Sequence, residues 1–203
     1  MKKIISLVLA AVLTLSLAAC GTKNDSKGDQ PAAPASALDL LEKVWSTYTD
    51  DEKFPTSGGD YSEANSKEDA PGVYDLTDRA AVDSALGLPE TAKVDQAASL
   101  VHMMNQNTFT AAAYHCTDDA DALATALRDN IQQRQWMCGF PDKLVIATLG
   151  NYVVSVYGDE ELVNTFRDKL QAAYSDAAIA YDEMIGEGEF SDGEDTALEA
   201  PVA

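Results

Sequence analysis

One pattern in the second half of the chain constrains the fold more than any other. Two apolar, β-prone segments precede an amphipathic helix, and this arrangement occurs twice in succession. A polar turn separates the first two segments and a Gly-Asn pair separates the other two, which is typical of β-hairpins. The expected strands are residues 97–104, 109–116, 143–149 and 152–157. The expected helices are residues 119–137 and the residues that follow Gly158-Asp159.

This order predicts an α+β fold with a four-stranded antiparallel sheet, made of two ββα units whose helices pack on one face. The two helices also share a sequence feature, because Arg128-Asp129 recurs 39 residues later as Arg167-Asp168. An old duplication would explain this recurrence. Two helices that solve the same packing problem would explain it equally well.

Two N-terminal helices are expected before the sheet. Residues 37–48 have apolar side chains at helical spacing behind Ser36, which can cap the helix with Asp39 three residues on. Residues 78–86 form a shorter helix that ends at a Gly-Leu-Pro stop signal.

Residues 50–75, between these two helices, are polar and contain several Gly and Pro residues, so we expect a long loop. Loops of this length are often functional, and recognition commonly occurs on loops. Aromatic side chains add apolar area, and a tyrosine also has a hydrogen-bonding tip. The candidate interaction residues of this loop are therefore Phe54, Tyr61 and Tyr74.

The chain begins with a segment that is typical of a secretory signal. Two lysines open it, an apolar stretch follows, and small residues end it, so residues 1–19 are expected to be removed on export. The apolar stretch is shorter than the roughly 20 residues of a membrane-spanning helix. Leu17-Ala18-Ala19-Cys20 then resembles the lipobox of bacterial lipoproteins. The resemblance implies a diacylglyceryl group on the Cys20 thiol that anchors the chain to the outer side of the cell membrane.

A second resemblance covers roughly residues 38–174. Arg134-Gln135, Phe140-Pro141 and residues 150–154 before a final helix are similar to a family of short lipoproteins, the domain of unknown function 4358. The family has no established activity, so the resemblance implies no functional residue. It agrees with the assignment as a lipoprotein.

The remaining segments define the expected domain boundaries. Residues 20–37 are the lipidated cysteine and a small, polar tether, and residues 38–180 are long enough for a single domain with a core. Residues 181–203 are rich in acids without a base, so we expect a disordered acidic tail.

Loss of residues 1–19 removes two lysines and no acid, which changes the formal net charge from −20 to −22. Such a surface repels phosphate backbones, which argues against nucleic acid as a partner.

The sequence contains no recognisable catalytic motif such as a nucleophile elbow, a Walker loop or His-Glu-x-x-His. Its two histidines are His102 and His115, and Cys116 follows the second one. Adjacent residues on a strand face opposite sides of the sheet, and His102 should lie about five residues, or ~16 Å, from Cys116. A dyad or metal site needs direct contact. We therefore assign no catalytic residue, metal or cofactor.

Other polar residues have structural interpretations. Asp118, Asp119 and Asp121 stand where a helix begins, so we expect capping rather than cation binding. Cys116 and Cys138 flank the helix expected over residues 119–137, whose ends would lie roughly 28 Å apart. A disulfide needs Cα atoms within about 7 Å, so we expect two free thiols.

Two classes of function remain. The scarcity of reactive side chains favours a non-enzymatic binding module at the cell surface, which would engage an envelope protein, a wall polymer or a peptide. The alternative is a cell-envelope hydrolase whose catalytic carboxylates lie in residues 50–75. A deep cleft with two facing carboxylates, one with a raised pKa, would indicate the hydrolase. A shallow apolar patch with a polar rim would indicate binding.

Overall fold

The computed structural model describes residues 33–137 and 139–186. The expected signal segment, Cys20, most of the tether and Cys138 lie outside these residues. The described part contains helices α1 (Ala37–Trp45), α2 (Arg79–Leu86), α3 (Ala120–Gln132) and α4 (Glu160–Ala173). No helix of this part is long and apolar enough to cross a membrane.

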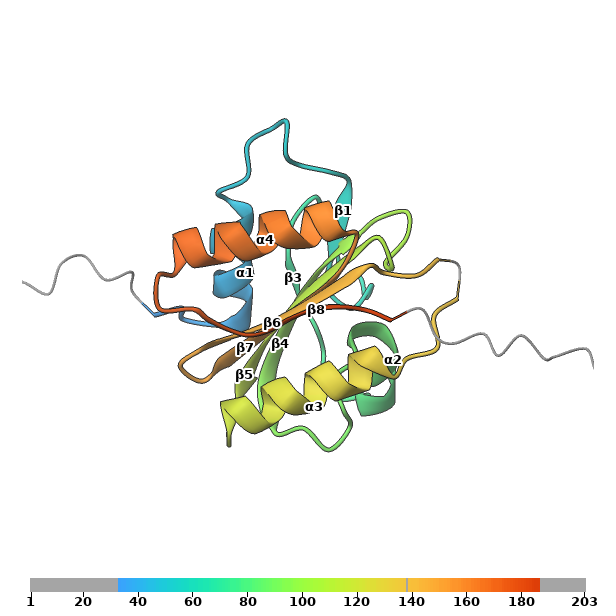
Figure 1. Cartoon of the computed structure of the whole chain (residues 1–203), viewed down its shortest axis with the longest axis vertical. Helices are drawn as coiled ribbons and strands as arrows, with labels where there is room; N and C mark the ends of the chain where they lie inside the picture. The colour runs from blue at the N-terminus through green and yellow to red at the C-terminus, as the bar shows by residue number, and fades with distance from the viewer. Residues whose placement is uncertain (1–32, 138, 187–203) are drawn as a thin grey trace, which may run out of the picture. The chain divides into compact units, whose positions relative to one another are not determined.

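Eight strands of the described residues form one antiparallel sheet (Figure 1). Its centre contains the four expected strands in the order β4-β5-β7-β6: β4 (Val94–His102), β5 (Phe109–Cys116), β6 (Lys143–Leu149) and β7 (Tyr152–Gly158). The predicted α+β class is retained, but the predicted four-stranded sheet is too small. The β4 edge is extended by β1 (Thr56–Gly58), β2 (Lys67–Glu68) and β3 (Gly72–Val73), and the β6 edge by β8 (Ala178–Met184).

The helices cover both faces of the sheet, so the expectation that they share one face is wrong (Figure 1). α1 and α4 pack on the face that contains Ala111 and Ala113, and α2 and α3 pack on the face that contains Ala112 and Tyr114. All four of these β5 side chains are fully buried. Successive apolar residues along a strand require cover on both sides. Helices on one face alone would leave half of these side chains in water.

Polar caps fix where the helices begin. Ser36 Oγ accepts a hydrogen bond from Asp39 N at 3.0 Å, as the sequence predicts. Asp119 Oδ1 accepts hydrogen bonds from Asp121 N at 3.0 Å and Ala122 N at 3.1 Å, which confirms the capping interpretation at α3. α3 ends at Gln132, earlier than the predicted end at residue 137.

Residues 50–75, expected to be a loop, contain three short strands along the edge of β4. The buried Ser99 side chain of β4 accepts a hydrogen bond from Gly59 N at 3.0 Å and donates one to Gly59 O at 3.2 Å. β1 and β3 approach so closely that a Cβ atom on Gly58 would lie 2.3 Å from Gly72 N. Strands of two or three residues have no periodic pattern, which is why the sequence predicts a loop here.

Strand β8 contains the position at which the acidic tail was expected to begin. Residues 181–184 therefore belong to the folded domain, and residues 187–203 lie outside the described residues. β8 is an edge strand whose side chains alternate between exposed and partly buried positions. Its acids resemble those of a solvated tail in sequence, which explains the misplaced boundary.

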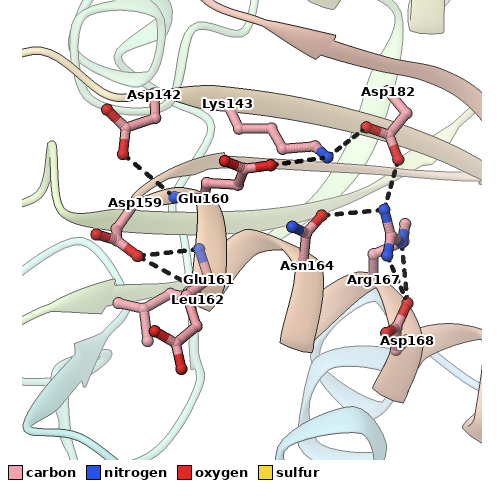
Figure 2. A network of polar contacts seen from close by, with 10 residues as sticks. All are labelled: Asp142, Lys143, Asp159, Glu160, Glu161, Leu162, Asn164, Arg167, Asp168 and Asp182. Atoms are coloured by element: carbon pink, nitrogen blue, oxygen red, sulfur yellow. Dashed lines mark hydrogen bonds and ion pairs between the residues drawn. The ribbon is translucent and has the colours of Figure 1, made fainter.

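The matching Arg-Asp pairs of α3 and α4 make equivalent contacts with β8. Arg128 Nε binds Glu183 at 2.8 Å on one face of the sheet. Arg167 binds Asp182 at 2.7 Å on the other face (Figure 2). A twofold rotation that exchanges the antiparallel neighbours β5 and β7 has its axis perpendicular to the sheet. Such a rotation does not exchange the two faces of the sheet. Two ββα units related by this rotation would place both helices on one face. The observed arrangement therefore argues against duplication and favours the alternative, that α3 and α4 share the Arg-Asp pair because both pack against β8.

Candidate interaction surface

The structure does not bring the two histidines and Cys116 together. His102 ends β4 at one end of the sheet, whereas Cys116 pairs with Val94 at the other. His115 Nδ1 lies 2.6 Å from Asp95 Oδ1, and Cys116 is a buried free thiol. Within residues 33–137 and 139–186, no three His, Cys, Asp or Glu side chains are arranged to hold a metal ion.

Of the three aromatic residues proposed for residues 50–75, two pack in the core. The Phe54 ring is partly buried, with its centroid 5.0 Å from that of Phe109 and 5.7 Å from that of His102. Tyr74 is buried on the face covered by α2 and α3. Tyr61 is 55% exposed. A partner can therefore contact Tyr61 readily, whereas the other two rings stabilise the fold.

Asp60 organises the loop that presents Tyr61. Its carboxylate accepts hydrogen bonds from Ser62 N at 3.0 Å, Asn65 Nδ2 at 2.8 Å and Asp75 N at 3.1 Å. Burial acts to raise the pKa of Asp60, but these hydrogen bonds outweigh it and lower the pKa to about 2. Tyr61 has a φ of 62°, a left-handed conformation that is uncommon for tyrosine. Such strain persists only where the surrounding structure enforces it, and it clusters at functional sites.

Exposed apolar side chains gather at one end of the sheet. The strand register places the end of β4, the start of β5, the end of β7, the start of β6 and the end of β8 at this end. The connecting loops of this end lie on the right-hand side of Figure 1. We define the methionine surface as Tyr61, Met103, Met104, Met137, Phe140 and Met184.

Every methionine after Met1 belongs to this surface, since the chain has five methionines in total. Met103, Met104, Met137 and Met184 are 45%, 81%, 79% and 57% exposed. Methionine commonly fills gaps in hydrophobic cores, and it is also overused on surfaces that bind several partners. Because all four described methionines are exposed, the second use fits this protein better.

Hydrogen bonds connect the loops of the methionine surface. Asn107 Nδ2 donates to Met137 O at 2.8 Å, which joins the β4–β5 loop to the α3–β6 connection. The Gln106 amide donates to the Tyr61 hydroxyl, which joins the same loop to residues 59–65. The backbone is therefore held at several points, while the methionine side chains remain in contact with solvent.

Acidic side chains border this surface. Four exposed acids lie where β6 begins and where β7 leads into α4, as Figure 2 shows: Asp142, Asp159, Glu160 and Glu161. Lys143 lies next to these acids, but its side chain is only 10% exposed and its ammonium lies 2.8 Å from Asp182 Oδ1. The exposed charge at this border is therefore negative.

Sequence reasoning missed this surface because it assigned Met103 and Met104 to a strand and Met137 to a helix. The signal that could have found it was the distribution of methionine. The predicted helices and strands have enough other apolar residues to form a core without the methionines. No family model matches this chain, and neither a curated protein nor a solved structure matches it. The resemblance to the short-lipoprotein family therefore stays a prediction.

Proposed function

We propose that this chain is a bacterial lipoprotein, held at the outer face of the cell membrane by lipid on Cys20, whose domain is a non-enzymatic binding module. The Leu17-Ala18-Ala19-Cys20 motif behind an apolar segment supports the anchor. The methionine surface is the observation that supports binding most strongly. It combines exposed apolar side chains, a hydrogen-bonded backbone and a polar border, which are features of interaction sites.

The alternative, a hydrolase with catalytic carboxylates in residues 50–75, has less support. A general acid of this kind needs a raised pKa. Hydrogen bonds from Lys169 and Thr49 instead lower the pKa of Glu52 to about 2, and a hydrogen bond with Thr77 lowers the pKa of Asp75. The pKa of Asp60 is lowered as well. These groups are stabilised as carboxylates, which suits structural roles better than proton donation.

Site-specific photo-cross-linking on intact cells tests the binding function. A photoreactive amino acid replaces Met104 in one variant and Gln171 in a control variant. Gln171 is exposed near the end of α4, away from the methionine surface. We expect a discrete cross-linked product from position 104 and none from position 171. Equal products from both positions, or hydrolysis of wall fragments or peptides by the purified domain, would contradict the proposal.

A further inference from the structure

We infer that the methionine surface receives a positively charged amphipathic segment of a partner protein. The inference rests on the proposed binding function and specifies the chemistry of the partner. It draws on two independent properties of the described residues. One is the concentration of exposed apolar side chains at this end of the sheet, and the other is the sign of the charges that surround them.

The apolar side chains of the surface suit the apolar stripe of a helix. Tyr61 and Phe140 are 55% and 50% exposed and offer rigid rings that can act as anchors. The methionines of the surface are unbranched and flexible, so they can adapt to the side chains of a docked helix. A partner that is polar on all sides would leave these thioethers and rings in water and would gain little from their burial.

Two bases at this end of the sheet are already engaged within the domain. Lys143 binds Asp182, as described above. Arg134 donates a hydrogen bond to the Tyr157 hydroxyl at 3.2 Å and another to Ser84 O, and its guanidinium lies 5.0 Å from the centre of the Trp136 ring. These contacts commit both positive charges to the fold. An acidic partner would therefore find little compensation here.

Two exposed bases lie near this end, Lys53 and Lys67, and Lys67 belongs to β2 beside β1. Lys53 lies two residues before Pro55, whose carbonyl oxygen accepts a hydrogen bond from Met103 N at 3.0 Å. Its neighbours Asp50 and Asp51 are exposed acids, whereas Glu52 forms an ion pair with Lys169 at 2.7 Å. The four exposed acids at the start of β6 and α4 outnumber these two bases, so the border of the methionine surface has a negative potential. Such a potential attracts a cationic segment and orients it during encounter.

A synthetic peptide provides a direct test. The probe is a fluorescently labelled peptide of leucine and lysine, about four helical turns long, with leucines on one face. A scrambled peptide of equal composition and a leucine–glutamate peptide are the controls. Binding to the full chain without its lipid is measured by fluorescence anisotropy. We expect the amphipathic basic peptide to bind best, and its affinity to fall as salt is raised above about 0.15 M, because salt screens exposed charges.

Substitutions at the surface separate its two properties. Replacing Met103, Met104 and Met137 together by serine removes apolar area and leaves every charge in place. We expect the peptide affinity to fall at least about 40-fold, the loss from roughly half-burying three such side chains. Replacement of the same three residues by leucine should change it less than about threefold, because the apolar area is retained. Val73→Ser, at an exposed apolar residue of β3, is the matched control and should leave binding unchanged.

Three outcomes would overturn the inference. Unchanged affinity of the serine variant would show that charge alone attracts the peptide. Equal losses in the leucine and serine variants would point to sulfur chemistry, not to apolar contact. Binding to neutral phosphatidylcholine vesicles without binding to the peptide would identify a lipid surface as the partner. Cross-linking at position 104 tests the proposed binding function separately from this inference, because a cross-linked product can also form with a partner that is not a cationic amphipathic segment.

Discussion

Replacing Asp182 by Asn should destabilise the domain more than replacing its neighbour Glu183 by Gln. The Asp182 carboxylate accepts hydrogen bonds from Lys143 at 2.8 Å and from Arg167 at 2.7 Å (Figure 2). The Asn side chain keeps the size of Asp but lacks its negative charge. Lys143 would then have Glu160, at 4.0 Å, as its nearest acid. Arg167 would keep its ion pair with Asp168.

The size of the effect follows from burial. The Lys143 side chain is 10% exposed and that of Asp182 is 32% exposed. Removing one partner of a fully buried ion pair costs roughly 3–5 kcal/mol, whereas exposed pairs contribute about 0–1 kcal/mol. The intermediate burial here predicts a loss of about 2 kcal/mol. Glu183→Gln should cost clearly less, because the Arg128 side chain is 37% exposed and retains Asp129.

The two substitutions are matched, since they remove one negative charge from adjacent residues of the same edge strand. Urea unfolding followed by tryptophan fluorescence measures both, because Trp45 and Trp136 are core-packed reporters. With a denaturant slope of about 2 kcal/mol per M, the Asp182→Asn midpoint should fall by about 1 M. Adding Lys143→Met to this variant should recover part of the loss, because it removes the unpaired buried charge.

The difference from wild type should also depend on pH. Burial acts to raise the pKa of Asp182, but hydrogen bonds from Lys143 and Arg167 outweigh it and lower the pKa. The stabilisation is therefore complete above the unfolded pKa of about 3.9 and is lost as pH falls through the lower folded value. Equal losses for Asp182→Asn and Glu183→Gln, or a difference that is unaffected by acid, would refute this reasoning.

Three further predictions concern the anchor, the sheet edge and the thiols. Cys20→Ala should move the chain expressed in bacteria from the detergent phase to the aqueous phase, and a wild-type chain already in the aqueous phase would disprove the anchor. Gly58→Ala should cost about 1–3 kcal/mol in urea unfolding, because its Cβ would meet the backbone of residues 70–72, whereas Gly186→Ala, which has open space, should change little. Thiol titration of the unfolded, unreduced mature chain should count Cys116 and Cys138 as two free thiols, and a count of zero in a monomer would contradict the prediction.

The central hairpins were predictable because their signals are local. Apolar runs with β-branched residues and the Gly150-Asn151 turn identify β6 and β7 from adjacent residues alone. The same runs also contained a signal that the prediction did not use. Consecutive apolar residues such as 111–114 in β5 indicate burial on both faces, and hence helices on both sides of the sheet.

The edge strands and the candidate surface depend on contacts between distant segments. Ser99 and Gly59 are 40 residues apart, and Arg128 and Glu183 are 55 residues apart. No pattern among neighbouring residues of the sequence predicts such contacts. Tyr61 was identified from its residue type, whereas the methionines were missed because an apolar side chain at a strand or helix end is usually counted as core.

The position of β8 has a consequence for how the domain is made. A ribosome synthesises the chain from its N-terminus, so the residues of all other described strands and helices have been made before residues 178–184 emerge. Until then the outer edge of β6 has no neighbour, and Lys143 and Arg167 lack Asp182. The β6 edge of the nascent domain therefore stays open until residues 178–184 have been made. For a chain that is exported as we propose, late closure would lengthen the period in which it can still be threaded through a membrane pore.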